Sequence, residues 1–251
     1  LLGFYDVAKK KALADNAVPP VLLLNTLFSA LLFSPFIISA EGGFGWFEGT
    51  VFDMPVGDAE AHALVAIKSS IVLVSWIFGY YGIKHLPITI VGPINATRPV
   101  LTLVGAMLIF GEQLNAYQWI GVLLAVISLF LLSRAGKSEG LDFTHNVWIL
   151  FVAAAAVTGA ASGLYDKFIM RSLDPVFVQS WYTLYQFVMM GLFVVLVWLP
   201  KHRHEKSFHW SWAIPCISIF LSCADFAYLS ALSEDGAMIS IVSMVRRSSV
   251  I

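Results

Sequence analysis

Long apolar runs without a charged side chain limit how this chain can fold more than any other feature. Five runs contain no Asp, Glu, Lys or Arg, and two more contain a single charge each, Lys68 and Arg98. The uncharged runs are 16–40, 113–133, 143–165, 175–200 and 207–224, and the singly charged runs are 62–83 and 87–110. A helix crosses the hydrocarbon core of a bilayer with about 20 mostly apolar residues. These runs therefore predict membrane-spanning helices, because a soluble domain would have too little polar surface around them.

The composition agrees with this interpretation. Hydrophobic residues make up 59% of the 251 residues and charged residues 12%, whereas soluble domains average about 45–50% apolar and about 25% charged residues. The net charge of −1 provides no basic surface for a nucleic acid, so we expect no nucleic-acid partner. Residues 1–13 and 236–251 have the character of partial helices. We therefore expect an all-α polytopic membrane protein with seven whole spans and two incomplete ones.

An internal repeat relates the two parts of the chain. Residues 3–13 align with residues 163–173, and the Gly, Tyr, Asp and Leu positions are identical. The two segments lie five predicted helices apart, and an odd number of crossings means that the two repeats run in opposite directions through the membrane. Inverted repeats of this kind are typical of secondary transporters. The predicted repeats are residues 1–142, in which helix 1 is incomplete, and residues 143–251, in which helix 9 is incomplete and helix 10 is absent.

Four short motifs carry a family resemblance. They are Gly3-Phe-Tyr-Asp6, Pro93-Ile-Asn-Ala-Thr-Arg-Pro99, Phe110-Gly-Glu-Gln-Leu114 and Gln118-Trp-Ile-Gly121. Together with the duplication, they resemble the EamA-type family of the drug/metabolite transporter superfamily. The resemblance implies a ten-helix carrier whose two halves enclose a central cavity, with the first and last helices cut in this chain. It also implies a small-molecule substrate, contact with membrane lipids, and a place in the plasma (inner) membrane of a prokaryote.

Charged side chains inside the bilayer are functional candidates, because burying one at a helix centre costs about 2.5–3.5 kcal/mol. Arg98 lies in a run that also contains Pro93 and Pro99, and a proline lacks the N–H that would bond to the carbonyl four residues earlier. We therefore predict a kinked helix in which Asn95 and Arg98 line a cavity, where freed carbonyls are tolerated. Arg98 would bind an anionic group of the substrate, and the alternative is a structural ion pair with a buried carboxylate.

Asp6 and Asp166 occupy equivalent positions in the two repeats, and each follows a tyrosine, Tyr5 or Tyr165. The functional interpretation makes them a coupling or gating pair that titrates during the transport cycle. The structural alternative is ion pairing with basic neighbours near the membrane interface. The pairs in question are Asp6 with Lys10, and Asp166 with Lys167 or Arg171.

The remaining candidates lie in the third, eighth and ninth predicted helices. Asp225 is near Tyr228 and has no basic neighbour within a helical turn, so we expect it to pair across the bundle. Its candidate partners are Arg98, Arg246 and Arg247. A weaker repeat match sets residues 87–101 against 236–250, which places Arg247 opposite Arg98 and puts both on the substrate pathway.

Two residues of the third predicted helix have interpretations of their own. Lys68 is expected to extend its ammonium group to the membrane interface. Tyr80 is either a stacking platform for the substrate or part of an interfacial aromatic belt. We count Tyr80 and Tyr228 among the residues of the substrate pathway.

The sequence contains no nucleotide-binding, catalytic or metal-binding motif, so we predict no cofactor and a driving force from an ion or substrate gradient. The leading hypothesis is a secondary-active transporter of a small polar metabolite. It would work by alternating access around a site formed by helices 3, 4, 8 and 9. The alternatives are an integral-membrane enzyme acting on lipid substrates and a non-transporting membrane scaffold or sensor.

Overall fold

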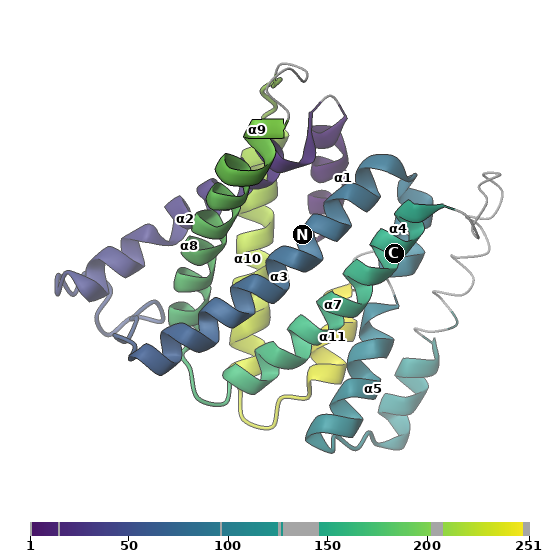
Figure 1. Cartoon of the computed structure of the whole chain (residues 1–251). Helices are drawn as coiled ribbons and strands as arrows, with labels where there is room; N and C mark the ends of the chain where they lie inside the picture. The colour runs from purple at the N-terminus through teal and green to yellow at the C-terminus, as the bar shows by residue number, and fades with distance from the viewer. Residues whose placement is uncertain are drawn as a thin grey trace.

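A computed structural model describes residues 2–14, 16–95, 97–124, 127, 146–201 and 208–247. This part of the chain is helical apart from short connections and one longer loop between α2 and α3, and it contains no strand (Figure 1). The helices are α1 (Leu2–Leu13), α2 (Val18–Glu41), α3 (Ala59–His85), α4 (Ile88–Asn95), α5 (Arg98–Phe110), α7 (Val147–Ile169), α8 (Pro175–Phe193), η2 (Val194–Trp198), α9 (Leu199–Lys201), α10 (Ala213–Ser233) and α11 (Ile239–Arg247). Residues 116–124 are also helical.

Six segments within these ranges are long and apolar enough to cross a membrane. They are Val18–Glu41, Ala59–His85, Ile88–Phe110, Val147–Ile169, Pro175–Trp198 and Ala213–Ser233. Each overlaps a predicted span, so the all-α polytopic membrane architecture is confirmed. The predicted span 113–133 extends into residues outside the described part, and the count of ten helices stays a prediction.

Side-chain caps fix where three of the helices begin. Asp58 caps α3, Asn146 caps α7 and Asp174 caps α8, each by accepting a hydrogen bond from a backbone N–H of the first turn. Asp174 is followed by Pro175, whose missing N–H removes no helical hydrogen bond at that position. Because each cap fixes the residue at which its helix begins, it also fixes how deep in the bundle the later polar side chains of that helix lie.

Helices from the two predicted repeats pack against each other throughout the bundle. α1 lies against α10, α2 against α8, α3 against α7, and α5 against α11. Each pair joins a helix of residues 1–142 to a helix of residues 143–251, which is the pairing that an approximate two-fold relation between the repeats would produce. Both buried apolar clusters also draw on both halves, for example Leu22 with Val152 and Val65 with Ile169. The boundary at residue 142 lies outside the described residues and stays a prediction.

The structure describes the helix that carries Arg98 as two segments, on either side of residue 96, which lies outside the described residues. α4 ends at Asn95, and α5 begins at Arg98. Pro93 lies inside α4, whereas Pro99 stands in the first turn of α5, where a missing N–H costs no helical hydrogen bond. Pro99 thus stands at the start of α5, and the predicted kink around residue 96 stays a prediction.

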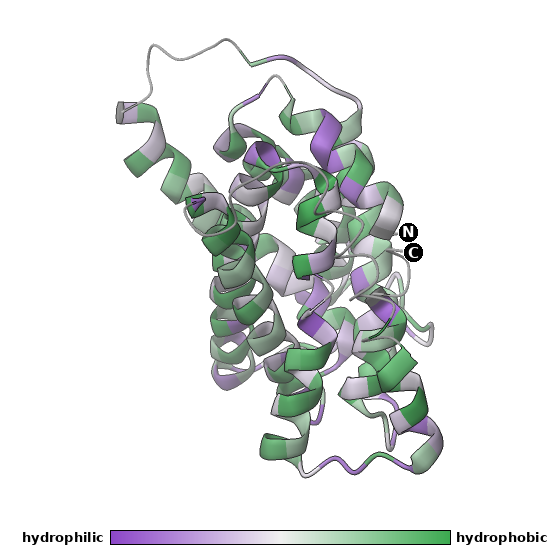
Figure 2. Cartoon of the chain, turned by 90° about the vertical axis from the view of Figure 1, so that its right-hand side faces the viewer, coloured by the Kyte–Doolittle hydropathy of each residue, from purple (hydrophilic) through white to green (hydrophobic). Residues whose placement is uncertain are grey.

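Polar residues are unevenly distributed over this bundle. Hydrophobic residues cover most of the helix lengths, and hydrophilic residues gather at the ends and at a few places inside (Figure 2). Interior polar groups need partners from the protein or from water, because hydrocarbon offers none. The inner polar residues therefore mark the region in which a functional site is to be sought.

Candidate functional site

A polar cavity of about 110 Å³ lies inside the bundle, with a wall built from α1, α3, α4, α5, α7, α8, α10 and α11. One water molecule occupies about 10–15 Å³ of such space, so the cavity admits several waters or a small solute. The charged residues of the wall are Asp6, Lys9, Lys68, Arg98, Asp166, Asp225 and Arg246. Charges at membrane depth are costly and mark functional sites. The sequence predicts the site on the third, fourth, eighth and ninth predicted helices, which correspond to α3, α4 with α5, α10 and α11. The observed site is wider, since α1, α7 and α8 also contribute to the cavity wall.

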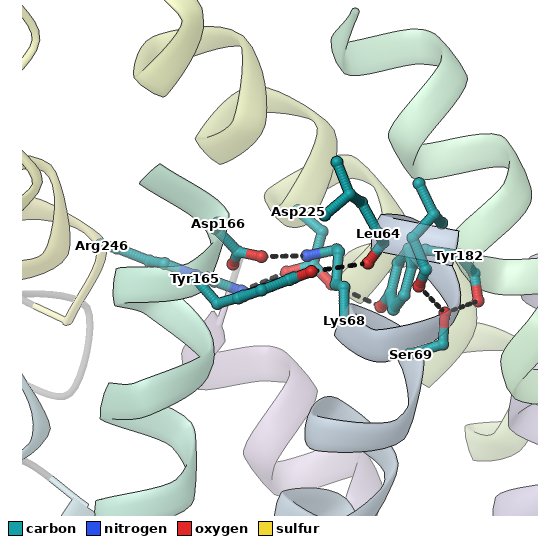
Figure 3. Close-up of polar contacts among 9 residues, drawn as sticks. Leu64, Lys68, Ser69, Tyr165, Asp166, Tyr182, Asp225 and Arg246 are labelled. Carbon is teal, nitrogen blue, oxygen red and sulfur yellow. Dashed lines mark hydrogen bonds and ion pairs between the residues drawn. The ribbon is translucent and has the colours of Figure 1, made fainter. Parts of the chain in front are cut away.

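The Lys68 ammonium and the Asp166 carboxylate form an ion pair between α3 and α7 (Figure 3). Their side chains are 4% and 6% exposed, so the pair is shielded from both water and lipid. The prediction that Lys68 extends to the membrane interface is wrong, because a carboxylate from another helix holds its Nζ inside the bundle.

Asp166 takes its partner from α3 and not from its own sequence neighbours. Lys167 donates to a backbone carbonyl of the α10–α11 connection at 2.5 Å, and the Arg171 guanidinium lies 4.8 Å from the centre of an aromatic ring of α5. Both predicted interfacial pairs of Asp166 are therefore replaced by the buried pair with Lys68.

Tyr182 of α8 connects this pair to a second ion pair. Its hydroxyl donates to Asp225 Oδ2 at 3.1 Å, and the Lys68 Nζ lies 4.8 Å from the centre of its ring (Figure 3). The other carboxylate oxygen of Asp225 accepts from Arg246 Nη2. The Arg246 guanidinium also lies 4.2 Å from the ring centre of Tyr228, which is part of the cavity wall. Asp225 is therefore paired with Arg246, one of the three arginines considered for it.

Arg98 occupies space that α7 leaves for it. Its Nη2 donates to Ser75 Oγ at 2.6 Å and to the Ala155 carbonyl oxygen at 2.8 Å. A Cβ at Gly159 would stand 1.5 Å from the same nitrogen, so glycine at this position leaves room for the guanidinium. Asn95, at the end of α4, lines the same cavity. Asn95 at the end of α4 and Arg98 at the start of α5 thus both lie at the cavity wall.

Asp6 and Tyr5 line the cavity from α1. The predicted pair of Asp6 with Lys10 is replaced by another contact, because Lys10 Nζ donates to the carbonyl oxygens of Ile83 and Leu86 at 2.6 and 2.9 Å. Lys10 thereby supplies hydrogen bonds to the C-terminal end of α3, and the Asp6 carboxylate stays on the cavity wall.

Tyr80 and Tyr165 are not among the residues of the cavity wall. Tyr80 is 0% exposed inside an apolar cluster, with Lys9 Nζ 4.5 Å from its ring centre. It is therefore neither a platform open to substrate nor part of an interfacial belt. The Tyr165 hydroxyl donates to a backbone carbonyl of α3 at 3.1 Å (Figure 3). Arg247 ends α11, and its side chain lies outside the described residues.

Comparison with known proteins places this fold and cavity in a family. A model of the EamA-like transporter family matches residues 1–134. The chain belongs to this family. EamA-family members are generally transporters, and the chain is accordingly an integral membrane protein of that family. No curated protein matches the chain significantly.

Solved structures support the same architecture for this EamA-family chain. Ten chains of solved structures match it significantly. One of them, a crystal structure of a protein, aligns with 20% sequence identity over 99% of this chain and 92% of its own length, with a TM-score of 0.57. At that identity the likeness shows a shared fold alone.

The Gly-Glu motif that suggested the EamA family has a structural role in this chain. Glu112 accepts hydrogen bonds from the Ile239 and Ser240 amides at 2.9 and 3.3 Å and from Ser240 Oγ at 2.6 Å. A carboxylate at a helix N-terminus satisfies free N–H groups and complements the helix dipole. Gly111, with φ of 64°, turns the chain out of α5 toward that position. The motif therefore positions α11, the helix that brings Arg246 to the cavity.

Sequence reasoning missed several polar residues of the cavity wall. They are Lys9, Ser75, Gln179 and Tyr182. A signal was available for α8, where Gln179, Thr183 and Gln186 recur at spacings of four and three in an otherwise apolar run. Such spacing places side chains on one helix face, and a polar face on a spanning helix points away from lipid.

Proposed function

We propose that this EamA-family protein is a secondary-active transporter of a small polar metabolite, works by alternating access, and resides in the plasma membrane of a prokaryote. The observation that carries the proposal is a polar cavity inside the bundle whose wall combines charged residues of both predicted repeats. Secondary transporters bind substrate near the middle of the membrane, at the interface between their repeats. The sequence carries no nucleotide-binding motif, so a gradient of ions or solute drives transport in this proposal.

The charges of the cavity favour a solute with an anionic group. The wall holds the cations Lys9, Lys68, Arg98 and Arg246 against the carboxylates Asp6, Asp166 and Asp225. Arg98 lines the cavity, and its Nη2 donates to Ser75 Oγ and to the Ala155 carbonyl oxygen, which hold the guanidinium at the wall. A guanidinium binds carboxylate or phosphate groups through parallel hydrogen bonds. We therefore assign Arg98 to the anionic group of the solute.

Alternating access assigns a role to the Lys68–Asp166 ion pair as well. Lys68 comes from the first predicted repeat and Asp166 from the second, so rocking of the repeats changes the distance between them. Separating a buried ion pair leaves charges without compensation and is costly, so the cycle requires other groups to take the place of each partner. A carboxylate that loses Lys68 requires another cation, and a proton or metal cation from the gradient would supply it. Asp166, and Asp6 as its repeat equivalent, are therefore our candidates for ion coupling.

Counterflow with the full-length protein in liposomes tests the proposed function. Mass spectrometry of the medium around overexpressing cells first identifies the released solutes, and each is then offered in labelled form to loaded liposomes. We expect the protein to exchange at least one solute with an anionic group. Exchange of none would refute transport and favour a scaffold or sensor, and conversion of membrane lipid without exchange would favour an enzyme.

A matched pair of arginine variants tests the anion site separately. Arg98→Ala is expected to lower the affinity for the solute, whereas Arg171→Ala, at the end of the bundle, is expected to leave it unchanged. Normal transport by both Arg98→Ala and Arg98→Lys would remove Arg98 from the site.

A further inference from the structure

A carboxamide without hydrogen bonds stands at the wall of the cavity. Gln179 of α8 lines the cavity and is 1% exposed. Neither its Nε2 nor its Oε1 has a hydrogen-bond partner among the described residues. Buried side-chain amides are almost always paired, because an unpaired polar atom loses its hydration without compensation. The position of Gln179 therefore calls for a partner that comes from the cavity.

Other unpaired groups lie near Gln179 but away from the cavity wall. Ser180 Oγ and Gln186 Nε2 of α8 and Asn25 Nδ2 of α2 are buried without partners in the described part of the chain. They belong to helices α2 and α8, which pack against each other and against α10. Ordered water is the usual partner of such groups. Gln186 is 1% exposed and stands on the face of α8 that also bears Gln179, so it provides a matched comparison.

We propose that the Gln179 carboxamide binds a neutral group of the transported solute that offers a hydrogen-bond donor and acceptor side by side, such as a primary amide, urea or lactam. The side-chain amide has two donor hydrogens and one acceptor oxygen. An anion would satisfy only Nε2 and a cation only Oε1, whereas a neutral amide-like group satisfies both. The inference rests on the proposed function and adds a neutral subsite to the anionic one at Arg98.

The neighbours of Gln179 support this assignment. Tyr182, one turn farther along α8, already donates to Asp225, and the nearby charges of Lys68 and Asp166 neutralise each other. Lys68 with Asp166, and Tyr182 with Asp225, are thus engaged with each other, whereas the Gln179 amide has no hydrogen-bond partner among the described residues. Water bound there in the empty carrier would have to be displaced by a group that reproduces both hydrogen bonds.

Saturation-transfer NMR with small probes tests the subsite without any transport step. The full-length protein in nanodiscs is mixed in turn with acetamide, acetate and methylammonium, which present a neutral donor–acceptor pair, an anion and a cation. We expect the acetamide signal to fall by half or more in Gln179→Leu and to stay unchanged in Gln186→Leu. Gln179→Met keeps the length of the side chain but removes its amide donor and acceptor, so the same loss is expected if the leucine variant does not fold.

Three outcomes would overturn the inference. They are an unchanged acetamide signal in Gln179→Leu, an equal loss of the acetamide signal in Gln179→Leu and Gln186→Leu, and a loss of the acetate signal in Gln179→Leu as large as that of the acetamide signal. Because binding is measured directly, these results are independent of the counterflow assay. Failure of the subsite is thereby distinguished from failure of the transport proposal.

Discussion

Replacing Lys68 by methionine leaves the Asp166 carboxylate buried without its ion-pair partner. Both side chains are almost inaccessible, at 4% and 6% exposure, so water cannot take the place of the lost ammonium group. Removing one partner of such a pair costs about 3–5 kcal/mol of folding free energy. We expect the loss to be largest at mildly alkaline pH and to shrink as the pH falls, because a protonated Asp166 is less costly to bury than a carboxylate.

The double variant Lys68→Met/Asp166→Leu removes both charges, so it shows how much of the lost stability comes from burying an unpaired carboxylate. With both charges gone, stability is expected to return to that of the wild type or to exceed it by about 1–4 kcal/mol. Unfolding of the purified full-length protein in mixed micelles, followed through the fluorescence of its tryptophans, measures all three stabilities. The control is Lys167→Met, which removes a single hydrogen bond to a carbonyl at the end of the bundle and is expected to cost no more than about 1–3 kcal/mol.

Two results would refute the reasoning about this pair. One is a loss of less than about 1 kcal/mol in Lys68→Met, which lies well below the range for a buried pair. The other is a double variant no more stable than the single variant. Either would show that Asp166 is solvated or paired in another way.

Three further substitutions test other parts of the structure. Gly159→Ala places a methyl group where the Arg98 guanidinium lies. The variant is expected to bind acetate about tenfold more weakly, because it loses a charge-assisted contact. Unchanged binding would show that the guanidinium has room elsewhere. Glu112→Ala removes the cap of α11 and is expected to lower stability by about 0.5–2 kcal/mol in the same unfolding assay, with a wild-type value contradicting the capping role. Asp166→Asn is expected to abolish the response of uptake to an imposed pH gradient while exchange continues, and a preserved response would exclude Asp166 from proton coupling.

The membrane spans can be predicted from the sequence because their signal is local. A run of apolar residues without charge has few alternatives to a buried or membrane-spanning helix, and Asp174 with Pro175 marks the start of α8 in the same local way. The partner of Asp166 has no local signal. Lys167 and Arg171 are nearer in sequence, but Lys68 reaches it from a position 98 residues away. Only the packing of α3 on α7 decides between them.

The choice between Arg246 and Arg247 depends on how α11 is rotated. Successive residues of a helix point about 100° apart, so a rotation of α11 decides which of its residues faces Asp225. A repeat match with few identities does not fix this rotation, which the structure assigns through the contacts of Arg246 with Asp225 and Tyr228.

The role of Gly159 likewise could not be predicted in full from the sequence. Small residues on a spanning helix indicate a close approach, but here the approaching group is the side chain of Arg98 and not only another helix backbone.

The two predicted repeats present different charges to the cavity, and this difference bears on the proposed cycle. Asp166 is neutralised by Lys68, whereas Asp6, its equivalent in the first repeat, lies on the cavity wall. Arg246 pairs with an aspartate of α10, whereas Arg98 contacts a serine of α3. Inverted repeats exchange conformations when access alternates, but α10 offers serines and no lysine to take the place of Lys68 beside Asp6.

The opposite state would therefore lack one of these ion pairs, and its relative free energy would depend on what occupies the cavity. A ligand shifts such an equilibrium only through its different affinities for the two states. In this scheme two bound ions compensate for the loss of the Lys68–Asp166 ion pair. One is a solute anion at Arg98, and the other is a cation taken up by Asp166. If transport follows this scheme, Lys68→Met should increase the fraction of empty carriers open to the opposite side. Cysteine accessibility on the two membrane faces would measure that shift, and equal accessibility in the variant and the wild type would exclude the ion pair from control of the cycle.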